Sequence, residues 1–177
     1  MRLLVSSIIT LCLFACDEPA FRGDEINSVY ESRDTLIKQF TNTDVWTRGG
    51  ATYVLNIYNR DGKVNGYTFK KQNGLKLESK TREFSLNEIE RFTDMDTVTE
   101  AKVVKELFSN MLKMMDSLSI REVTVSFSHL GITLKFNLKG GGVVFYVKDL
   151  KAVTIPSWLN YIKDSKKLDE NWYFNEK

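Results

Sequence analysis

Apolar and polar residues follow two distinct periods along this chain. A helical period, with an apolar residue at every third or fourth position, runs from about Glu25 to Thr41 and most clearly from Val98 to Leu118. A period of two, in segments rich in β-branched and aromatic residues, predicts six strands. These strands are Thr52–Tyr58, Val64–Lys71, Leu75–Phe84, Val123–Phe127, Ile132–Leu138 and Val143–Val147.

Turn residues separate the predicted strands. Asp61-Gly62 and Asn73-Gly74 tolerate positive φ, so they predict tight hairpins that join the first three strands into an antiparallel meander. The glycines at 140–142 lie between the last two strands. A phosphate-binding loop would lead into a helix, and these glycines lead into a strand, so we interpret them as a hairpin.

The order of these elements predicts an α+β fold. We expect an antiparallel sheet of about six strands with two main helices packed on one face, in the order α-β-β-β-α-β-β-β plus a C-terminal tail. The tail would contain a short helix starting at Pro156 and a last edge strand at Trp172–Phe174. The repeated element order hints at two similar units that share one sheet.

Length and composition are those of one ordinary folded domain. The chain has 177 residues, of which 42% are hydrophobic and 27% are charged, and it is long enough to bury a core without disulfides. The formal net charge of +2 includes a cation in the N-terminal segment. The charge therefore gives no basis for expecting a nucleic-acid partner.

The N-terminus has the pattern of a secretory signal peptide. Arg2 precedes about a dozen mostly apolar residues, a run too short for a permanent membrane-spanning helix. The next four residues, Leu13-Phe14-Ala15-Cys16, resemble the lipobox of bacterial lipoproteins. The resemblance implies that Cys16 carries lipid, palmitate included, and becomes the first residue of the mature chain. It places the protein in the bacterial cell envelope, anchored to a membrane, and leaves inner and outer membrane as alternatives.

This resemblance divides the chain into three parts. We expect a cleaved signal peptide at 1–15, the lipidated cysteine and a tether at 16–23, and a single α+β domain at 24–177. Cys12 would leave with the signal peptide, and Cys16 would carry lipid. The mature domain would then have no thiol for a disulfide, a nucleophile or a metal site.

Few residues indicate catalysis, and we assign no catalytic, cofactor-binding or metal site. His129 is the only histidine and lies in a predicted turn, so a histidine-based zinc site is not expected. Asp94 and Asp96, with Glu100 nearby, lack the glycine-bearing loop of an EF-hand and are typical of a polar link before a helix.

Aromatic residues concentrate near the C-terminus and form the candidate interaction surface, because aromatic side chains are common anchors of binding interfaces. They are Trp158, Tyr161, Trp172, Tyr173 and Phe174. Closing the core is their alternative role. The sequence thus favours a lipid-anchored binding module, not an enzyme, with an envelope protein or polymer as partner. The alternatives are an envelope hydrolase, whose carboxylates spacing alone cannot locate, and an inhibitor or immunity-type lipoprotein.

Overall fold

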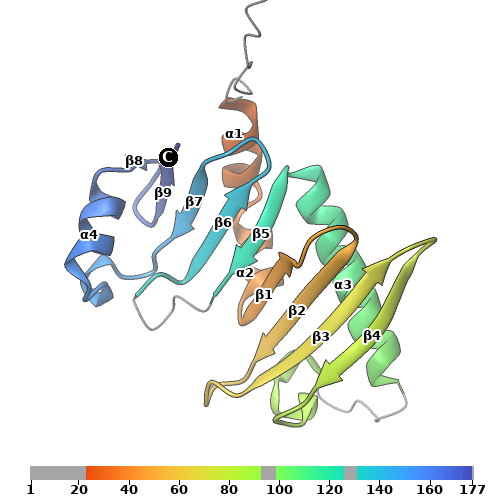
Figure 1. Cartoon of the computed structure of the whole chain (residues 1–177). Coiled ribbons are helices and arrows are strands. Elements are labelled where there is room, and N and C mark those ends of the chain that lie inside the picture. Colours follow the sequence, from red (N-terminus) through yellow and green to blue (C-terminus); the bar gives the residue numbers. More distant parts are fainter. Residues whose placement is uncertain (1–22, 93–98, 126–130, 177) are drawn as a thin grey trace, which may run out of the picture.

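A computed structural model describes residues 23–92, 99–125 and 131–176 (Figure 1). They form one antiparallel sheet of nine strands in the order β4-β3-β2-β1-β5-β6-β7-β9-β8. The strands are β1 (Thr43–Thr47), β2 (Thr52–Tyr58), β3 (Val64–Lys71), β4 (Leu75–Thr81), β5 (Ile120–Thr124), β6 (Leu134–Leu138), β7 (Val143–Tyr146), β8 (Lys166–Lys167) and β9 (Trp172–Asn175). The helices are α1 (Gly23–Glu31), α2 (Arg33–Phe40), α3 (Glu100–Ser117) and α4 (Pro156–Lys163), with short 3₁₀ turns η1 (Leu86–Glu88), η2 (Glu90–Phe92) and η4 (Leu150–Ala152).

The sheet consists of two halves that meet at its centre. There β1 and β5 pair antiparallel, with Val45 opposite Val123. From this line the strands run outward as β1-β2-β3-β4 on one side and β5-β6-β7-β9-β8 on the other. Helices precede the first strand of each half: α1 and α2 before β1, and α3 before β5. The two halves therefore share an element order and differ mainly in the segment after β7.

Helices α1, α2 and α3 cover one face of the sheet, which we call the helix face (Figure 1). Their apolar side chains pack against alternate strand residues from both halves, so one continuous core crosses the centre of the sheet. Phe40 from α2 meets Phe136 from β6 edge to face at 6.2 Å, and Phe108 from α3 lies 4.6 Å from Phe69 of β3. All four rings are fully buried.

Helix α4 packs on the opposite face, which we call the outer face. Because strand side chains alternate between faces, Val144 and Phe174 belong to the main core while their neighbours Phe145 and Tyr173 point the other way. Phe145 and Tyr173 form a second, smaller core with Ile162 of α4. In the described part of the chain, only the β7–β9 end of the outer face is covered by a helix.

The predicted fold is therefore wrong in four respects. The sheet has nine strands instead of about six, four helices are present instead of two main ones, and they cover both faces. The expected order α-β-β-β-α-β-β-β is also wrong, because two helices and four strands precede α3, and α4 lies between β7 and β8. The helix expected over Glu25–Thr41 is divided at Ser32, where the Arg33 guanidinium donates to the Tyr30 carbonyl at 3.2 Å. The expected edge strand at Trp172–Phe174 is an inner strand, since β8 pairs beyond it.

The hydrophobic pattern missed two strands, the two-residue β8 and the longer β1. Its five residues include Asp44, which interrupts any apolar run. In the fold Asp44 is only 3% exposed, and it accepts hydrogen bonds from the Val125 amide and from the Tyr58 hydroxyl, the latter at 2.6 Å. These partners lie 81 and 14 residues away along the chain, so this satisfied, buried aspartate could not be recognised locally.

Both predicted hairpins are present. Strands β2 and β3 have the predicted limits, whereas β4 begins at the predicted Leu75 and ends at Thr81 instead of Phe84. Asn73 and Gly74 both have positive φ, at 50° and 119°, which is the conformation for which this residue pair is favoured.

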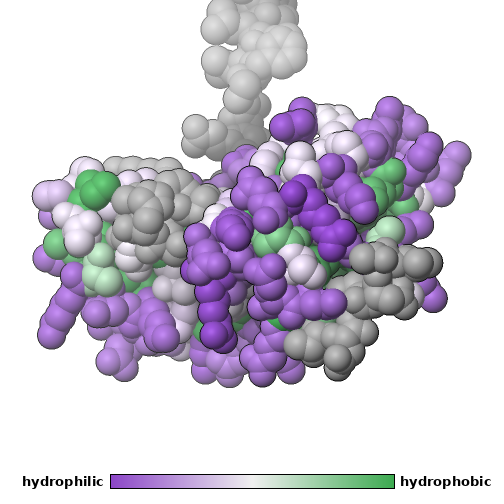
Figure 2. Space-filling view, turned by 90° about the horizontal axis from the view of Figure 1, so that it is seen from below, coloured by the Kyte–Doolittle hydropathy of each residue, from purple (hydrophilic) through white to green (hydrophobic). Residues whose placement is uncertain are grey.

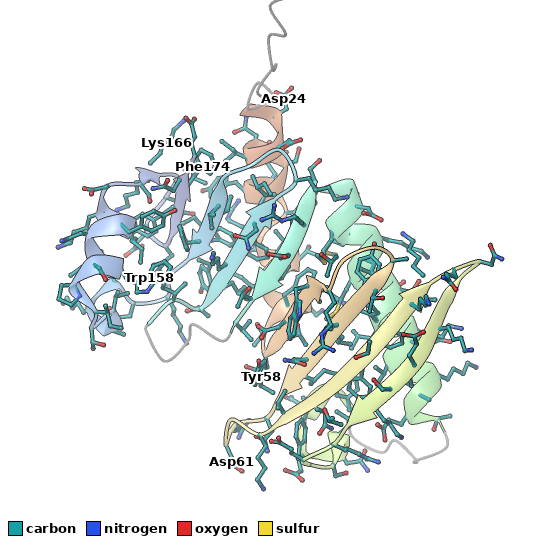
Figure 3. All side chains as sticks on the ribbon, viewed as in Figure 1. Asp24, Tyr58, Asp61, Trp158, Lys166 and Phe174 are labelled. Carbon is teal, nitrogen blue, oxygen red and sulfur yellow. The ribbon has the colours of Figure 1, made fainter. Side chains whose placement is uncertain are left out.

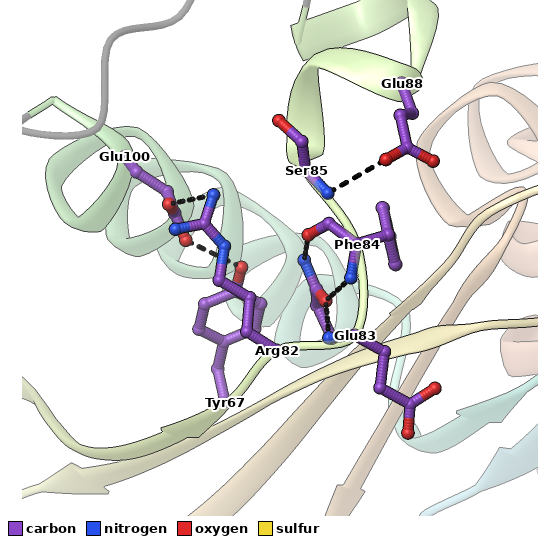
Figure 4. A network of polar contacts seen from close by, with 8 residues as sticks. Tyr67, Arg82, Glu83, Phe84, Ser85, Glu88 and Glu100 are labelled. Atoms are coloured by element: carbon purple, nitrogen blue, oxygen red, sulfur yellow. Dashed lines mark hydrogen bonds and ion pairs between the residues drawn. The ribbon is translucent and has the colours of Figure 1, made fainter.

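A buried polar network stabilises the first half near the start of α3 (Figure 4). The Glu100 carboxylate, 3% exposed, accepts from the Tyr67 hydroxyl at 3.1 Å and lies 2.9 Å from the Arg82 guanidinium. The buried side chain of Asn65 accepts from the amides of residues 83 and 84 and donates to the Phe84 carbonyl. Together these contacts tie β3 and the segment after β4 to the start of α3.

Candidate binding site

The structure divides the five C-terminal aromatic residues into two groups. Trp172, Tyr173 and Phe174 are only 2%, 6% and 2% exposed. Trp172 stacks on Phe136 of β6, with ring centroids 5.9 Å apart and planes 14° from parallel. These three residues form core in β9 and leave little surface for a partner.

Trp158 and Tyr161 belong to the second group and are half-buried on α4. Their spacing of three places them on the same helix face. Both rings stand edge-on to the buried Phe145 ring, at 6.5 and 5.6 Å between centroids, and they are 5.7 Å from one another. The three rings form an aromatic corner where α4 meets β7.

This corner borders an open hollow of about 220 Å³ on the outer face, which we call the α4 pocket. Its lining consists of Lys135, Phe145, Ser157, Trp158 and Tyr161. Lys135 and Phe145 are direct partners across the β6–β7 ladder, so the strand register places a cation beside the aromatic floor. The proline at the start of α4 occupies the first helical turn, where its missing amide hydrogen costs no helical hydrogen bond, and it starts the helix that carries the pocket wall.

The pocket combines apolar walls with one cationic side chain. Burial lowers the pKa of Lys135 because a desolvated ammonium is disfavoured; Glu122 on β5 opposes this shift, and Arg121 adds to it. Burial also raises the pKa of Tyr161, which keeps its phenol neutral at physiological pH. The charge that a ligand would meet on the lining is therefore positive.

Two carboxylates on the part of the outer face next to the pocket accept hydrogen bonds from groups of the protein itself. Glu122 accepts a hydrogen bond from Asn137 at 2.9 Å. Asp44 is held by Tyr58 and by the Val125 amide. Burial and the hydrogen bond to Asp44 raise the pKa of Tyr58 to about 12, so this phenol remains a donor over the physiological range. Neither carboxylate is presented as a free acid or base.

A second hollow lies at the turn between β2 and β3, at the lower end of the sheet. Its lining includes Lys38, Arg60, Glu88 and Glu90, so it carries charges of both signs. The Asn59 side chain accepts from two amides of the turn and donates to Glu88 at 3.3 Å. Figure 2 shows that the molecule seen from this end is mostly hydrophilic. These contacts stabilise the turn. The described lining of this hollow has a single aromatic side chain, whereas three aromatic side chains line the α4 pocket.

Sequence reasoning identified two of the five pocket residues. Trp158 and Tyr161 are among the predicted anchors, whereas Lys135, Phe145 and Ser157 are not. In the sequence, Lys135 is one of several polar residues in an alternating strand, and Phe145 is one of several apolar residues in the following strand. Only the register between β6 and β7 brings the two together.

Several predicted features lie outside the described residues. They are the lipobox cysteine Cys16, the turn histidine His129 and the acidic pair Asp94 and Asp96. Within the described ranges, histidine, cysteine and acidic residues form no group of three or more that could hold a metal ion. No helix in that same part of the chain is long and apolar enough to span a membrane. Comparison of the chain with protein-family models, with curated proteins and with solved structures finds no match.

Proposed function

We propose that this protein is a lipid-anchored component of the bacterial cell envelope that binds another envelope component through the outer face of its sheet. The observation that carries the binding role is the α4 pocket, where Trp158 and Tyr161 remain half-buried beside Lys135. A half-buried aromatic pair in a concave site is the usual setting of a binding anchor.

The lipobox resemblance at Leu13–Cys16 supports the anchor. Seven residues lead from Cys16 to Gly23, where α1 begins. Such a segment spans at most about 24 Å, so the α1 end of the domain would stay close to the membrane. Asp24 marks that end, and Asp61, in the β2–β3 turn, marks the opposite end (Figure 3).

The state of the nearby carboxylates favours binding over hydrolysis. A carboxylate-based hydrolase needs two acids with separate proton-transfer roles in one cleft. Asp44 and Glu122 both lie on the outer face and both accept hydrogen bonds from neighbouring groups. None of the described residues that line the α4 pocket is an acid.

Metabolic labelling with a clickable fatty acid tests the anchor. The wild-type chain should be labelled in cells, and Cys16→Ala should lose the label because the acceptor sulfur is gone. Cys12→Ala is the matched control, since it removes the other cysteine and leaves the lipobox intact. Equal labelling of wild type and Cys16→Ala would refute lipidation at this residue.

Photocrosslinking in intact cells tests the binding face. A photoreactive phenylalanine analogue at position 158 should give a crosslinked product, and the same analogue at position 61, on the exposed turn far from α4, is the control. The product at 158 should weaken when Lys135→Met is added, because the pocket loses its charge. Similar products at both positions, insensitive to Lys135→Met, would contradict a role for this pocket.

A further inference from the structure

The walls of the α4 pocket restrict the shape of a ligand. Phe145 forms a floor that is fully buried, and the Trp158 ring is inclined to it by 75°. Trp158 and Tyr161 are nearly perpendicular to one another, at 88°. Such an aromatic corner offers ring faces and edges over which a flat or nearly flat ring packs well.

The volume restricts its size. The pocket holds about 220 Å³, below the range of roughly 300–1,000 Å³ that is typical of sites for larger small molecules. One six-membered ring with a small substituent is therefore a suitable occupant, and a multi-ring molecule would have to extend over the outer face.

The charge restricts its chemistry. Lys135 is the cation among the described lining residues, and the phenol of Tyr161 is neutral. Arg121 and Glu122 on β5, whose charges also act on Lys135, lie 4.0 Å apart as an ion pair, so together they add no net charge beside the pocket. A partly desolvated ammonium attracts an anion more strongly than a fully hydrated one does. Ser157 adds a hydroxyl that can donate to or accept from a polar substituent.

We propose that the α4 pocket binds a ligand that carries a carboxylate on a single six-membered ring. The ring packs against Trp158 and Tyr161, and the carboxylate pairs with Lys135. This proposal rests on the function proposed above, because it names the ligand class of the same site. Sugar acids of envelope polymers and aromatic acids share this chemistry.

Ligand-observed NMR on the full lipidated chain in detergent micelles tests the proposal. The probes are glucuronate and benzoate, each compared with its neutral counterpart, glucose and benzamide. At least one acid should bind about tenfold or more tightly than its counterpart, as expected for one charge-assisted contact. Glucuronate binding alone would identify the sugar source, and benzoate binding alone would identify the aromatic source.

Three variants make the test specific. Lys135→Met keeps the aliphatic stem and should remove the preference for the acid. Trp158→Leu should weaken binding of acid and neutral compound alike, since both lose the ring contact. Lys76→Met, on the exposed β4 strand at the far side of the sheet, should bind as wild type does. A thermal melt of each variant verifies that it is folded.

Two results would overturn the proposal. One is the absence of binding by either acid up to millimolar concentrations, and the other is acid binding that Lys135→Met leaves unchanged. If the crosslink at position 158 persists in cells while both acids fail, the ligand class is wrong and the binding site stands. If neither acid binds and no crosslink forms at position 158 in cells, both the ligand class and the proposed function are wrong.

Discussion

The two halves of the sheet start alike and are completed differently. In the first half, β1 to β4 follow one another through short turns, and no described helix packs on their outer face. In the second half, a segment that contains η4, α4 and β8 is inserted between β7 and β9. This insertion covers part of the outer face and creates the α4 pocket. The candidate site is thus a product of the departure from symmetry between the halves.

The two halves also differ in the contacts that stabilise the regions farthest from the centre of the sheet. The first half uses buried polar contacts, with Glu100 joining Tyr67 and Arg82. The second half uses a small apolar core, in which Ile162 and Phe145 are fully buried. Apolar burial is non-directional, whereas a buried charge is tolerated only with its partners in place. The two regions should therefore respond differently to mutation.

The largest effect is expected from Ile162→Ala, which opens a cavity in the second core. Such a truncation costs ~2–5 kcal/mol, and here the loss should fall on α4. Hydrogen exchange should show reduced amide protection in α4 and β9 while β1 to β3 keep theirs. Phe136→Ala, in the core shared by both halves, is the contrasting variant and should reduce protection throughout the sheet. Uniform loss in both variants would show that the second core is not a separate unit.

A smaller effect is expected from Glu100→Gln, which keeps the shape of the side chain and removes its charge. The cost should be ~1–3 kcal/mol, because the bonds to Tyr67 and Arg82 weaken within a buried site. Urea denaturation measures it, with Glu106→Gln on the exposed side of the same helix as control. The control should stay within about 0.5 kcal/mol of wild type. Equal stabilities for the two variants would mean that the network contributes little.

The smallest effect concerns alkaline pH and Tyr58. Its pKa is raised in the folded protein from 10.0 to about 12, so the folded state holds the phenolic proton more tightly than the unfolded chain does. The stabilisation is complete below pH 10 and is lost as the pH rises toward 12. Urea midpoints measured across this window should fall less steeply for Tyr58→Phe than for wild type. The pKa of Tyr67 is also raised by burial and by Glu100, so Tyr58→Phe should still lose some stability as the pH rises. An identical slope in the variant would contradict the raised pKa of Tyr58.

Local chemistry was sufficient for some elements of this fold. Strands β2 and β3 have their predicted limits because β-branched and aromatic residues fill them and turn-forming pairs bound them. Helix α3 lies within the predicted Val98–Leu118, since its buried residues recur at helical spacing. In each case the decisive residues are neighbours along the chain.

Tertiary structure alone decided the strand count, the side on which α4 packs and the composition of the site. Asp44 became a buried polar residue of β1 through partners far away in sequence. The α4 pocket required the register that sets Lys135 opposite Phe145, together with the return of α4 onto the outer face. By itself the sequence determined the lipobox resemblance, the alternating strands and the turns, because these depend on adjacent residues. Which aromatic side chains are buried and which line a pocket depended on long-range packing, which no local pattern encodes.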